Sequence, residues 1–260
     1  MSVETVHVGP APRLAVSVAG SGSLMLFLHG IRGNRGNWAA QIETFSKRYR
    51  AAAWDARGYG DSDDYAGPLQ FDHFSGDVLR VIEHFGVKQA HLVGLSMGGR
   101  IARNVALRFP ERLCSLTLVN TTPGFDSMSI DEVRRFVTER RTQTPESVRK
   151  LLGSRARAGA FDALWQSVST MREESYRKTL EASVAQDRGA PIENIRVPTL
   201  VVSGDEDTVY PPALARDVAR RIPGAELVMI KGAGHLVNLE RPGRFNEVLM
   251  DFIERQERKS

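Results

Sequence analysis

The sequence has a single cysteine among its 260 residues and no hydrophobic run of membrane-spanning length. One cysteine cannot pair within the chain, which excludes a scaffold held together by internal disulfides. The longest apolar run near the N-terminus is Leu24–Leu28, far short of the roughly 20 residues that cross a bilayer and too short for the core of a signal peptide. We therefore expect a globular protein of the cytoplasm with no membrane partner.

The chain also lacks a large excess of charge of either sign. It has 35 lysines and arginines against 31 aspartates and glutamates, a formal net charge of +4, and 42% of its residues are hydrophobic. This composition favours a folded chain over a disordered one. Because the basic residues are interspersed with acidic ones, we expect no nucleic-acid partner. The densest basic stretch, residues 149–157, is typical of a solvated helix face, with a patch that attracts anionic substrates as the alternative.

Short apolar runs alternate with amphipathic segments over the first 120 residues. Leu24–Leu28 is apolar throughout, which is typical of a parallel strand covered on both faces. The segment 74–85 repeats its apolar side chains with helical spacing, and Gly86 supplies a stop signal. Other apolar runs of strand length occur at residues 51–54, 91–95 and 116–119. The alternation predicts a mostly parallel sheet flanked by crossover helices.

The pattern changes between residues 123 and 190, where no run has the character of a core strand. One helix is predicted to begin at Pro145 behind a Thr144 cap. Other helices are predicted around residues 133–137, 161–168 and 173–185. After residue 190 the strands and helices alternate again. The sequence therefore predicts a core of residues 1–122 and 191–260, interrupted by an all-helical insertion of residues 123–190.

The strongest chemical signal is the segment Gly94-Leu95-Ser96-Met97-Gly98, which fits the pattern G-x-S-x-G. It stands directly after an apolar strand and directly before a helix, the context that this pattern requires. A sharp turn there exposes the serine hydroxyl, and the N-terminus of the following helix favours a developing negative charge. The pattern predicts Ser96 as a nucleophile.

A serine nucleophile needs a base, and the base needs an acid that orients it. In this architecture the acid and then the histidine follow the serine along the chain. Asp205 and Asp207 both follow the strand at 199–203, and His235 follows the strand at 227–230 behind two glycines. We favour Asp207 as the acid, with Asp205 as the alternative, and His235 as the base.

Acyl transfer also needs two N–H donors for the developing oxyanion. We expect one from Met97, the residue after the nucleophile. The other is expected from the loop after Leu24–Leu28, at Ile31, with Arg32 as the alternative. His29 in the same loop is interpreted as a structural hydrogen-bonding residue beneath the site.

Together these segments resemble the α/β-hydrolase superfamily over nearly the whole chain. The resemblance rests on five motifs in order: residues 28–30, 55–62, 94–99, 204–207 and 234–235. It implies Ser96 as nucleophile, Asp207 as acid and His235 as base, and it implies that the helical insertion caps the site. Neither a metal nor a cofactor is expected, because no metal-ligand spacing occurs in the sequence.

Within the superfamily, branches with an aspartate nucleophile are disfavoured because position 96 is serine. Carbon–carbon hydrolases of meta-cleavage products usually carry asparagine before the serine and tryptophan after the histidine, where this chain has Leu95 and Leu236. Residues 232–242 and 94–99 are similar to the 3-oxoadipate enol-lactonase branch and its esterase relatives.

This comparison predicts a serine hydrolase that cleaves a small carboxylic ester or lactone through an acyl-enzyme. Three alternatives stay open: a carbon–carbon hydrolase, a cofactor-free perhydrolase or oxygenase, and a ligand-binding receptor with slow turnover. The oligomeric state also stays open, with a homodimer as one option.

The substrate pocket is harder to predict from sequence. We expect Trp38, Phe125, Met128 and Trp165 to line an apolar cleft between the insertion and the core. Arg32 and Arg35, in the loop after Leu24–Leu28, are candidates to bind a carboxylate of the substrate, with solvent-exposed side chains as the alternative.

Overall fold

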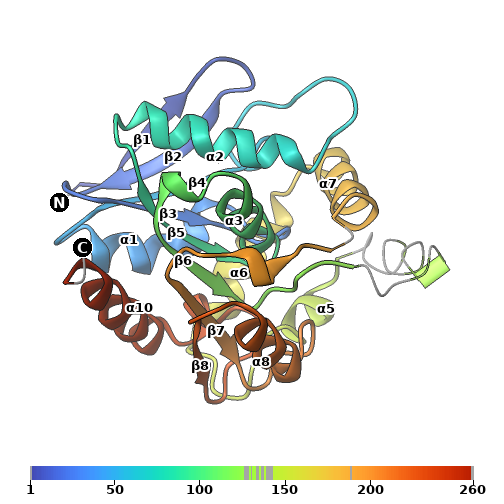
Figure 1. Ribbon diagram of the computed structural model, residues 1–260. Coiled ribbons are helices and arrows are strands. Elements are labelled where there is room, and N and C mark those ends of the chain that lie inside the picture. The colour runs from blue at the N-terminus through green and yellow to red at the C-terminus, as the bar shows by residue number, and fades with distance from the viewer. Residues whose placement is uncertain are drawn as a thin grey trace.

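The computed structural model describes residues 2–125, 129, 131, 132, 135, 138, 143–187 and 189–258. Its centre is an eight-stranded sheet with the strand order β1-β2-β4-β3-β5-β6-β7-β8 (Figure 1). The strands are β1 (Glu4–Val8), β2 (Leu14–Ala19), β3 (Leu24–Leu28), β4 (Arg50–Trp54), β5 (Ala90–Leu95), β6 (Leu113–Val119), β7 (Thr199–Gly204) and β8 (Glu226–Ile230).

The sheet is parallel from β4 through β8, whereas β2 pairs antiparallel with both β1 and β4. Its central strands are almost continuously apolar because helices cover both of their faces. The expected class, a mostly parallel α/β sheet of the α/β-hydrolase type, is confirmed. Within the part of the chain described here, no helix combines the length and apolar character needed to cross a bilayer.

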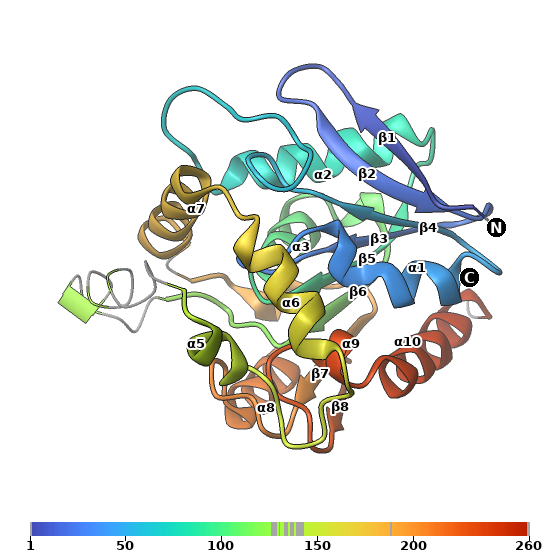
Figure 2. The same ribbon diagram turned by 180° about the vertical axis from the view of Figure 1, so that it is seen from behind.

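Two layers of helices enclose the sheet (Figures 1 and 2). One face is covered by α2 (Asp72–His84), α3 (Met97–Arg108) and α8 (Pro212–Arg221), whose apolar sides share a core with the strands. The opposite face is covered by α1 (Ala39–Phe45) and α10 (Pro242–Glu257), which belong to a second core. The short helices α1 and α9 (Val237–Glu240) were not predicted, because one or two turns carry too little periodicity to recognise.

Between β6 and β7 the described residues contain α5 (Pro145–Arg149), α6 (Ala160–Ser169) and α7 (Glu173–Ala185). The predicted cap of α5 is present, because the Thr144 side chain accepts a hydrogen bond from Ser147 N at 3.1 Å. In Figure 2 α5 and α7 lie toward one side of the molecule, whereas α6 crosses in front of the sheet, and its Leu164 and Val168 belong to the second core. The helix predicted from Val133, Phe136 and Val137 rests on residues outside the described part of the chain. The division into core and insertion stays a prediction.

Glycine allows α3 to begin very close to the neighbouring strand. A Cβ atom at Gly98 would lie 2.3 Å from the carbonyl oxygen of Leu28, at the end of β3. Because a backbone atom blocks the space, no side chain could move aside to admit it. The absence of a side chain at Gly98 therefore fixes the distance between α3 and β3, and with it the position of the turn at Ser96.

This packing predicts opposite effects for two glycine-to-alanine substitutions. We expect Gly98→Ala to lower the free energy of unfolding by at least about 1–3 kcal/mol because the added methyl group overlaps β3. Gly76→Ala, inside α2 with open space around its Cβ position, should raise it by about 0.5–1 kcal/mol. Urea unfolding of both variants tests the pair, and a Gly98→Ala protein as stable as wild type would contradict the packing argument.

Candidate active site

Ser96 occupies the turn between β5 and α3 in a backbone conformation that residues other than glycine rarely adopt, with φ 54° and ψ −113°. Two hydrogen bonds hold this strained turn. Ser96 N donates to the Val119 carbonyl at 2.8 Å, and Thr121 Oγ1 donates to the Ser96 carbonyl at 2.7 Å. The strain is thus maintained by the neighbouring strand β6, and the hydroxyl stands at the N-terminus of α3.

His235 and Asp207 form a hydrogen-bonded pair in the loops after β8 and β7. The distance from His235 Nδ1 to Asp207 Oδ2 is 2.9 Å. The other oxygen of Asp207 accepts hydrogen bonds from Val209 N at 2.8 Å and Tyr210 N at 3.1 Å. Since an ionised carboxylate only accepts, the proton of the pair lies on Nδ1, which leaves Nε2 of His235 as a base.

The alternative acid, Asp205, has a different partner. Its Oδ1 accepts a hydrogen bond from Gly232 N at 2.7 Å and so ties the loop after β7 to the loop after β8. Of the two candidates, the structure brings Asp207 to His235 and places Asp205 as a brace between the loops.

Two buried polar residues that the sequence analysis missed hold the histidine loop in place. Glu240 accepts hydrogen bonds from three backbone N–H groups, those of Gly153, Gly234 and Leu236, at 2.6–2.9 Å. Burial raises the pKa of the Glu240 carboxyl, although these three donors oppose the shift. Asn120 donates to the Gly234 carbonyl at 2.8 Å and accepts from Gly204 N at 3.1 Å. Neither residue belongs to a periodic pattern, so nothing in the sequence marked them.

His29 lies beneath the loop after β3, as interpreted from the sequence. Its Nε2 accepts a hydrogen bond from Ala56 N at 3.1 Å, so the neutral ring carries its proton on Nδ1 and donates it to the Gly30 carbonyl at 2.7 Å. Burial lowers the pKa of His29. The imidazole is therefore a neutral brace that shapes the loop leading to Ile31.

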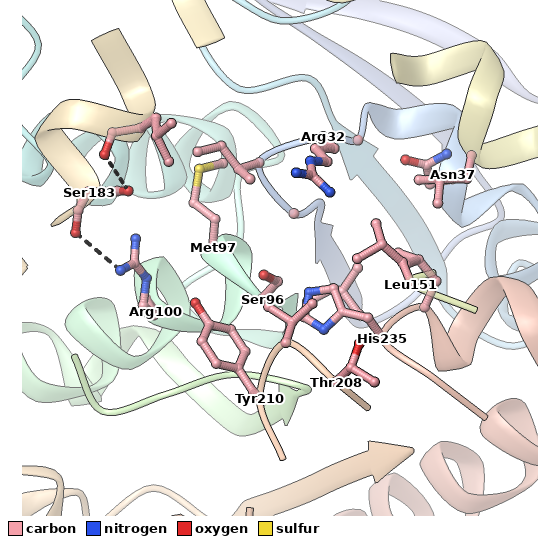
Figure 3. A pocket seen from close by; sticks show the side chains of 18 of the residues that line it. Arg32, Asn37, Ser96, Met97, Arg100, Leu151, Ser183, Thr208, Tyr210 and His235 are labelled. Atoms are coloured by element: carbon pink, nitrogen blue, oxygen red, sulfur yellow. Dashed lines mark hydrogen bonds between the residues drawn. The ribbon is translucent and has the colours of Figure 1, made fainter. Parts of the chain in front are cut away.

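A pocket of about 560 Å³ opens over the turn at Ser96 (Figure 3). Six of the predicted site residues line it: Ile31, Arg32, Ser96, Met97, Phe125 and His235. In Figure 3 the Ser96 hydroxyl and the His235 ring lie next to each other on its floor. Asp207 is not part of the lining and bonds to His235 Nδ1. Its further lining includes Arg100, Tyr176 and Tyr210, none of which the sequence analysis selected.

Two tryptophans expected in the pocket are not part of its described lining, and Arg35 instead pairs with Asp55 and Asp61. Trp38 is fully buried in the core, with its ring 5.0 Å from that of Phe27 and 6.0 Å from that of Phe245. Trp165 stacks on Phe161 at 6.1 Å and is not part of the pocket lining. The Trp38 ring thus packs against side chains of β3 and α10, and the Trp165 ring packs against a side chain of its own helix, α6. Met128 lies outside the described residues.

An open α/β sheet that carries a serine turn after β5, an acid after β7 and a histidine after β8 defines a hydrolase-type site. The chain belongs to the alpha/beta hydrolase family, whose model matches residues 25–248. It is thus a hydrolase of the α/β-hydrolase superfamily.

Curated relatives of the chain act on different substrates. It is 26% identical to 3-oxoadipate enol-lactonase 2 of Acinetobacter baylyi, over 89% of this chain and 88% of the relative. It is 28% identical to a 2-hydroxy-6-oxononadienedioate/2-hydroxy-6-oxononatrienedioate hydrolase of Paraburkholderia phymatum, over 96% and 94%. Among solved structures, a thermophilic esterase from Thermogutta terrifontis matches with a TM-score of 0.86 and 26% identity, over 98% of this chain and 99% of that one.

The neutral state of His29 predicts a pH dependence of stability. Because burial lowers its pKa below the ordinary value of 6.5, the unfolded chain takes up this proton first as the pH falls. The free energy of unfolding should therefore decrease below about pH 6.5, by up to about 1.4 kcal/mol per pH unit for this group.

Urea unfolding at pH 7.0 and 5.5 measures this effect. The decrease should be smaller in His29→Gln than in wild type, and it should be unchanged in His84→Gln, which replaces an exposed histidine. An equal decrease in wild type and His29→Gln would show that another group carries the pH dependence.

Proposed function

We propose that the protein is a serine hydrolase that cleaves a carboxylic ester or lactone of a small organic substrate through an acyl-enzyme. The observation that carries this proposal is the His235–Asp207 hydrogen bond of 2.9 Å at a pocket that also contains Ser96. A histidine oriented in this way can accept the proton of a neighbouring hydroxyl.

In the proposed reaction, His235 Nε2 takes the Ser96 proton as Ser96 Oγ attacks the substrate carbonyl carbon. The carbonyl electrons move onto oxygen, where the N–H groups of Ile31 and Met97 stabilise the oxyanion. Collapse of this intermediate expels the alcohol oxygen, which takes the proton from His235. A water molecule then repeats the sequence on the acyl-enzyme and releases the acid, while Asp207 stabilises the imidazolium in both halves.

Two observations support an ester or lactone as the substrate. Relatives similar over nearly the whole chain include a named enol-lactonase and a named esterase. The pocket wall includes apolar side chains such as Leu95, Leu164 and Leu180, which can contact the carbon skeleton of a small organic acyl group. A carbon–carbon hydrolase remains the second candidate because one relative carries that type of name.

The insertion is proposed to act as a cap over this pocket. Leu151, Leu164, Tyr176 and Leu180 all come from the stretch between β6 and β7, and all line the pocket that contains Ser96. Closure by these side chains would exclude bulk water from the reacting carbonyl, which strengthens the electrostatic stabilisation of the oxyanion.

Intact-mass analysis after treatment with a fluorophosphonate probe tests the nucleophile. Wild type should gain the mass of one probe, and Ser96→Ala should gain none. Ser147→Ala is the matched control, because it removes another serine hydroxyl from the same pocket and should keep full labelling. A folded wild type that is not labelled would argue against serine catalysis and favour a ligand-binding role.

Replacing Asp207 and replacing Asp205 by asparagine are predicted to have very different effects on kcat. Asp207→Asn should lower kcat for ester hydrolysis by roughly 10⁴-fold, because an amide neither fixes the His235 tautomer nor stabilises the imidazolium. Asp205→Asn should act on the stability of the loop and change kcat by less than about tenfold, since Asp205 bonds to Gly232 N. Steady-state kinetics and thermal unfolding of both variants separate the two roles, and equal losses of kcat would refute the assignment.

A further inference from the structure

The pocket wall has an uneven distribution of charge. Among the described residues, its lining contains three cationic side chains, those of Arg32, Arg100 and Lys150, and neither aspartate nor glutamate. Lys150 is mostly exposed and already pairs with Glu146 at 2.8 Å. The two arginines are therefore the cations available to a molecule in the pocket, and their surroundings differ.

Arg100 is built into the pocket wall. It lies one turn along α3 from Ser96, whose carbonyl accepts the Arg100 N–H at 3.2 Å, and its residue is only 2% exposed. The guanidinium packs against two aromatic rings, 4.9 Å from the centroid of Phe71 and 4.7 Å from that of Phe125. These rings hold its plane in one orientation, so an incoming anion meets a preorganised cation.

The charge of this group is only partly balanced. Arg100 and Arg103 are both almost fully buried and share one buried carboxylate, that of Asp187. Arg103 forms a hydrogen bond with Asp187, whereas Arg100 Nε lies 3.4 Å from Asp187 Oδ2 and forms no hydrogen bond. Within the described part of the chain, these two positive charges have no second carboxylate as partner.

The remaining donors of Arg100 are also incompletely used. Nη1 donates to the Ser183 carbonyl at 3.1 Å, as Figure 3 shows, and Nη2 has no hydrogen-bond partner among the described residues. Burial lowers the pKa of Arg103, although Asp187 opposes the shift. A buried cation without a full counter-charge is costly unless a ligand completes its pairing.

Arg32 supplies a second cation from another direction. Its side chain has neither a hydrogen-bond nor an ion-pair partner among the described residues, and it enters from the loop after β3. In Figure 3, Arg32 and Arg100 lie on either side of the Met97 side chain. Both arginines thus border the space above Ser96.

We propose that the substrate is an ester or lactone bearing a carboxylate, which binds at Arg100 with Arg32 as a second cation. A planar monoanion can accept two parallel hydrogen bonds from a guanidinium that packs against two rings. Its single negative charge matches the one positive charge that remains when Asp187 is counted against Arg100 and Arg103. This inference rests on the proposed ester or lactone hydrolysis and adds the class of substrate.

The test compares esters that differ only in the terminal group. Monomethyl succinate, glutarate and adipate are paired with methyl butanoate, pentanoate and hexanoate, and methanol release is measured. In at least one pair, wild type should show a kcat/KM about 10- to 100-fold higher for the acidic ester. Arg100→Gln and Arg32→Gln should each reduce this preference, because each should lower kcat/KM by a larger factor for the acidic ester than for its neutral partner.

Arg108→Gln is the matched control. Arg108 lies two turns further along α3 and pairs at the surface with Asp72 at 2.9 Å, so its loss should leave the preference unchanged. If Arg100→Gln fails to fold, Arg100→Lys replaces it, because lysine keeps the charge but loses the planar fork. A reduced preference in the folded Arg100→Lys protein supports the proposal, and an unchanged one overturns it.

Other outcomes separate this inference from the proposed function. Equal kcat/KM values for every pair in wild type would overturn the carboxylate subsite and leave ester hydrolysis standing. If Ser96 is labelled by the fluorophosphonate but no ester is cleaved, the proposal of ester hydrolysis is wrong. The carboxylate subsite is then tested by measuring how far a dicarboxylate protects Ser96 from labelling. Glutarate should then slow labelling of wild type more than that of Arg100→Gln, and equal rates would overturn the subsite.

Discussion

The hydrogen bond between His235 and Asp207 depends on how two loops are held at the edge of the sheet. Strands β7 and β8 are parallel neighbours, so their carboxyl ends bring the two loops together. Asp205 and Asn120 then join the two loops through hydrogen bonds to backbone N–H and carbonyl groups, and Glu240 binds backbone N–H groups of the histidine loop and of Gly153. The His235–Asp207 pair thus depends on these three side chains as well as on the two strands.

The proposed nucleophile is positioned by the same sheet through a different constraint. Ser96 keeps a positive φ because β6 accepts its N–H and because Gly98 brings α3 against β3. Relaxation of this turn would break the bond to Val119 and separate the helix from the strand. The packing of β3, β5 and β6 therefore stabilises the strained conformation of Ser96, and its hydroxyl stays at the N-terminus of α3.

Features that repeat along the chain, or that follow one another in a fixed order, could be predicted from the sequence. Fully apolar strands such as Leu24–Leu28 and the serine turn were predicted because burial on both faces and a sharp turn leave strong patterns. The pocket was predicted less well. Trp38 and Trp165 look the same in sequence whether they pack in the core or face a cavity. Arg100 was missed because an arginine on a helix is ordinarily solvated, and its burial depends on Phe71 and Phe125, which are distant in the chain.

Arg100 also lies next to both ends of the helical stretch between β6 and β7. Phe125 precedes the helices of that stretch and Asp187 follows them, and Phe125 N donates to the Asp187 carbonyl at 3.2 Å. Both residues contact Arg100, one through its ring and the other through its carboxylate. A change in the length or tilt of these helices would therefore alter the pocket wall at Arg100. The same stretch also contacts the histidine loop, because the Leu151 carbonyl accepts the His235 N–H at 2.7 Å and Gly153 N donates to Glu240 at 2.6 Å. The pocket wall at Arg100 and the position of His235 are therefore coupled through this stretch.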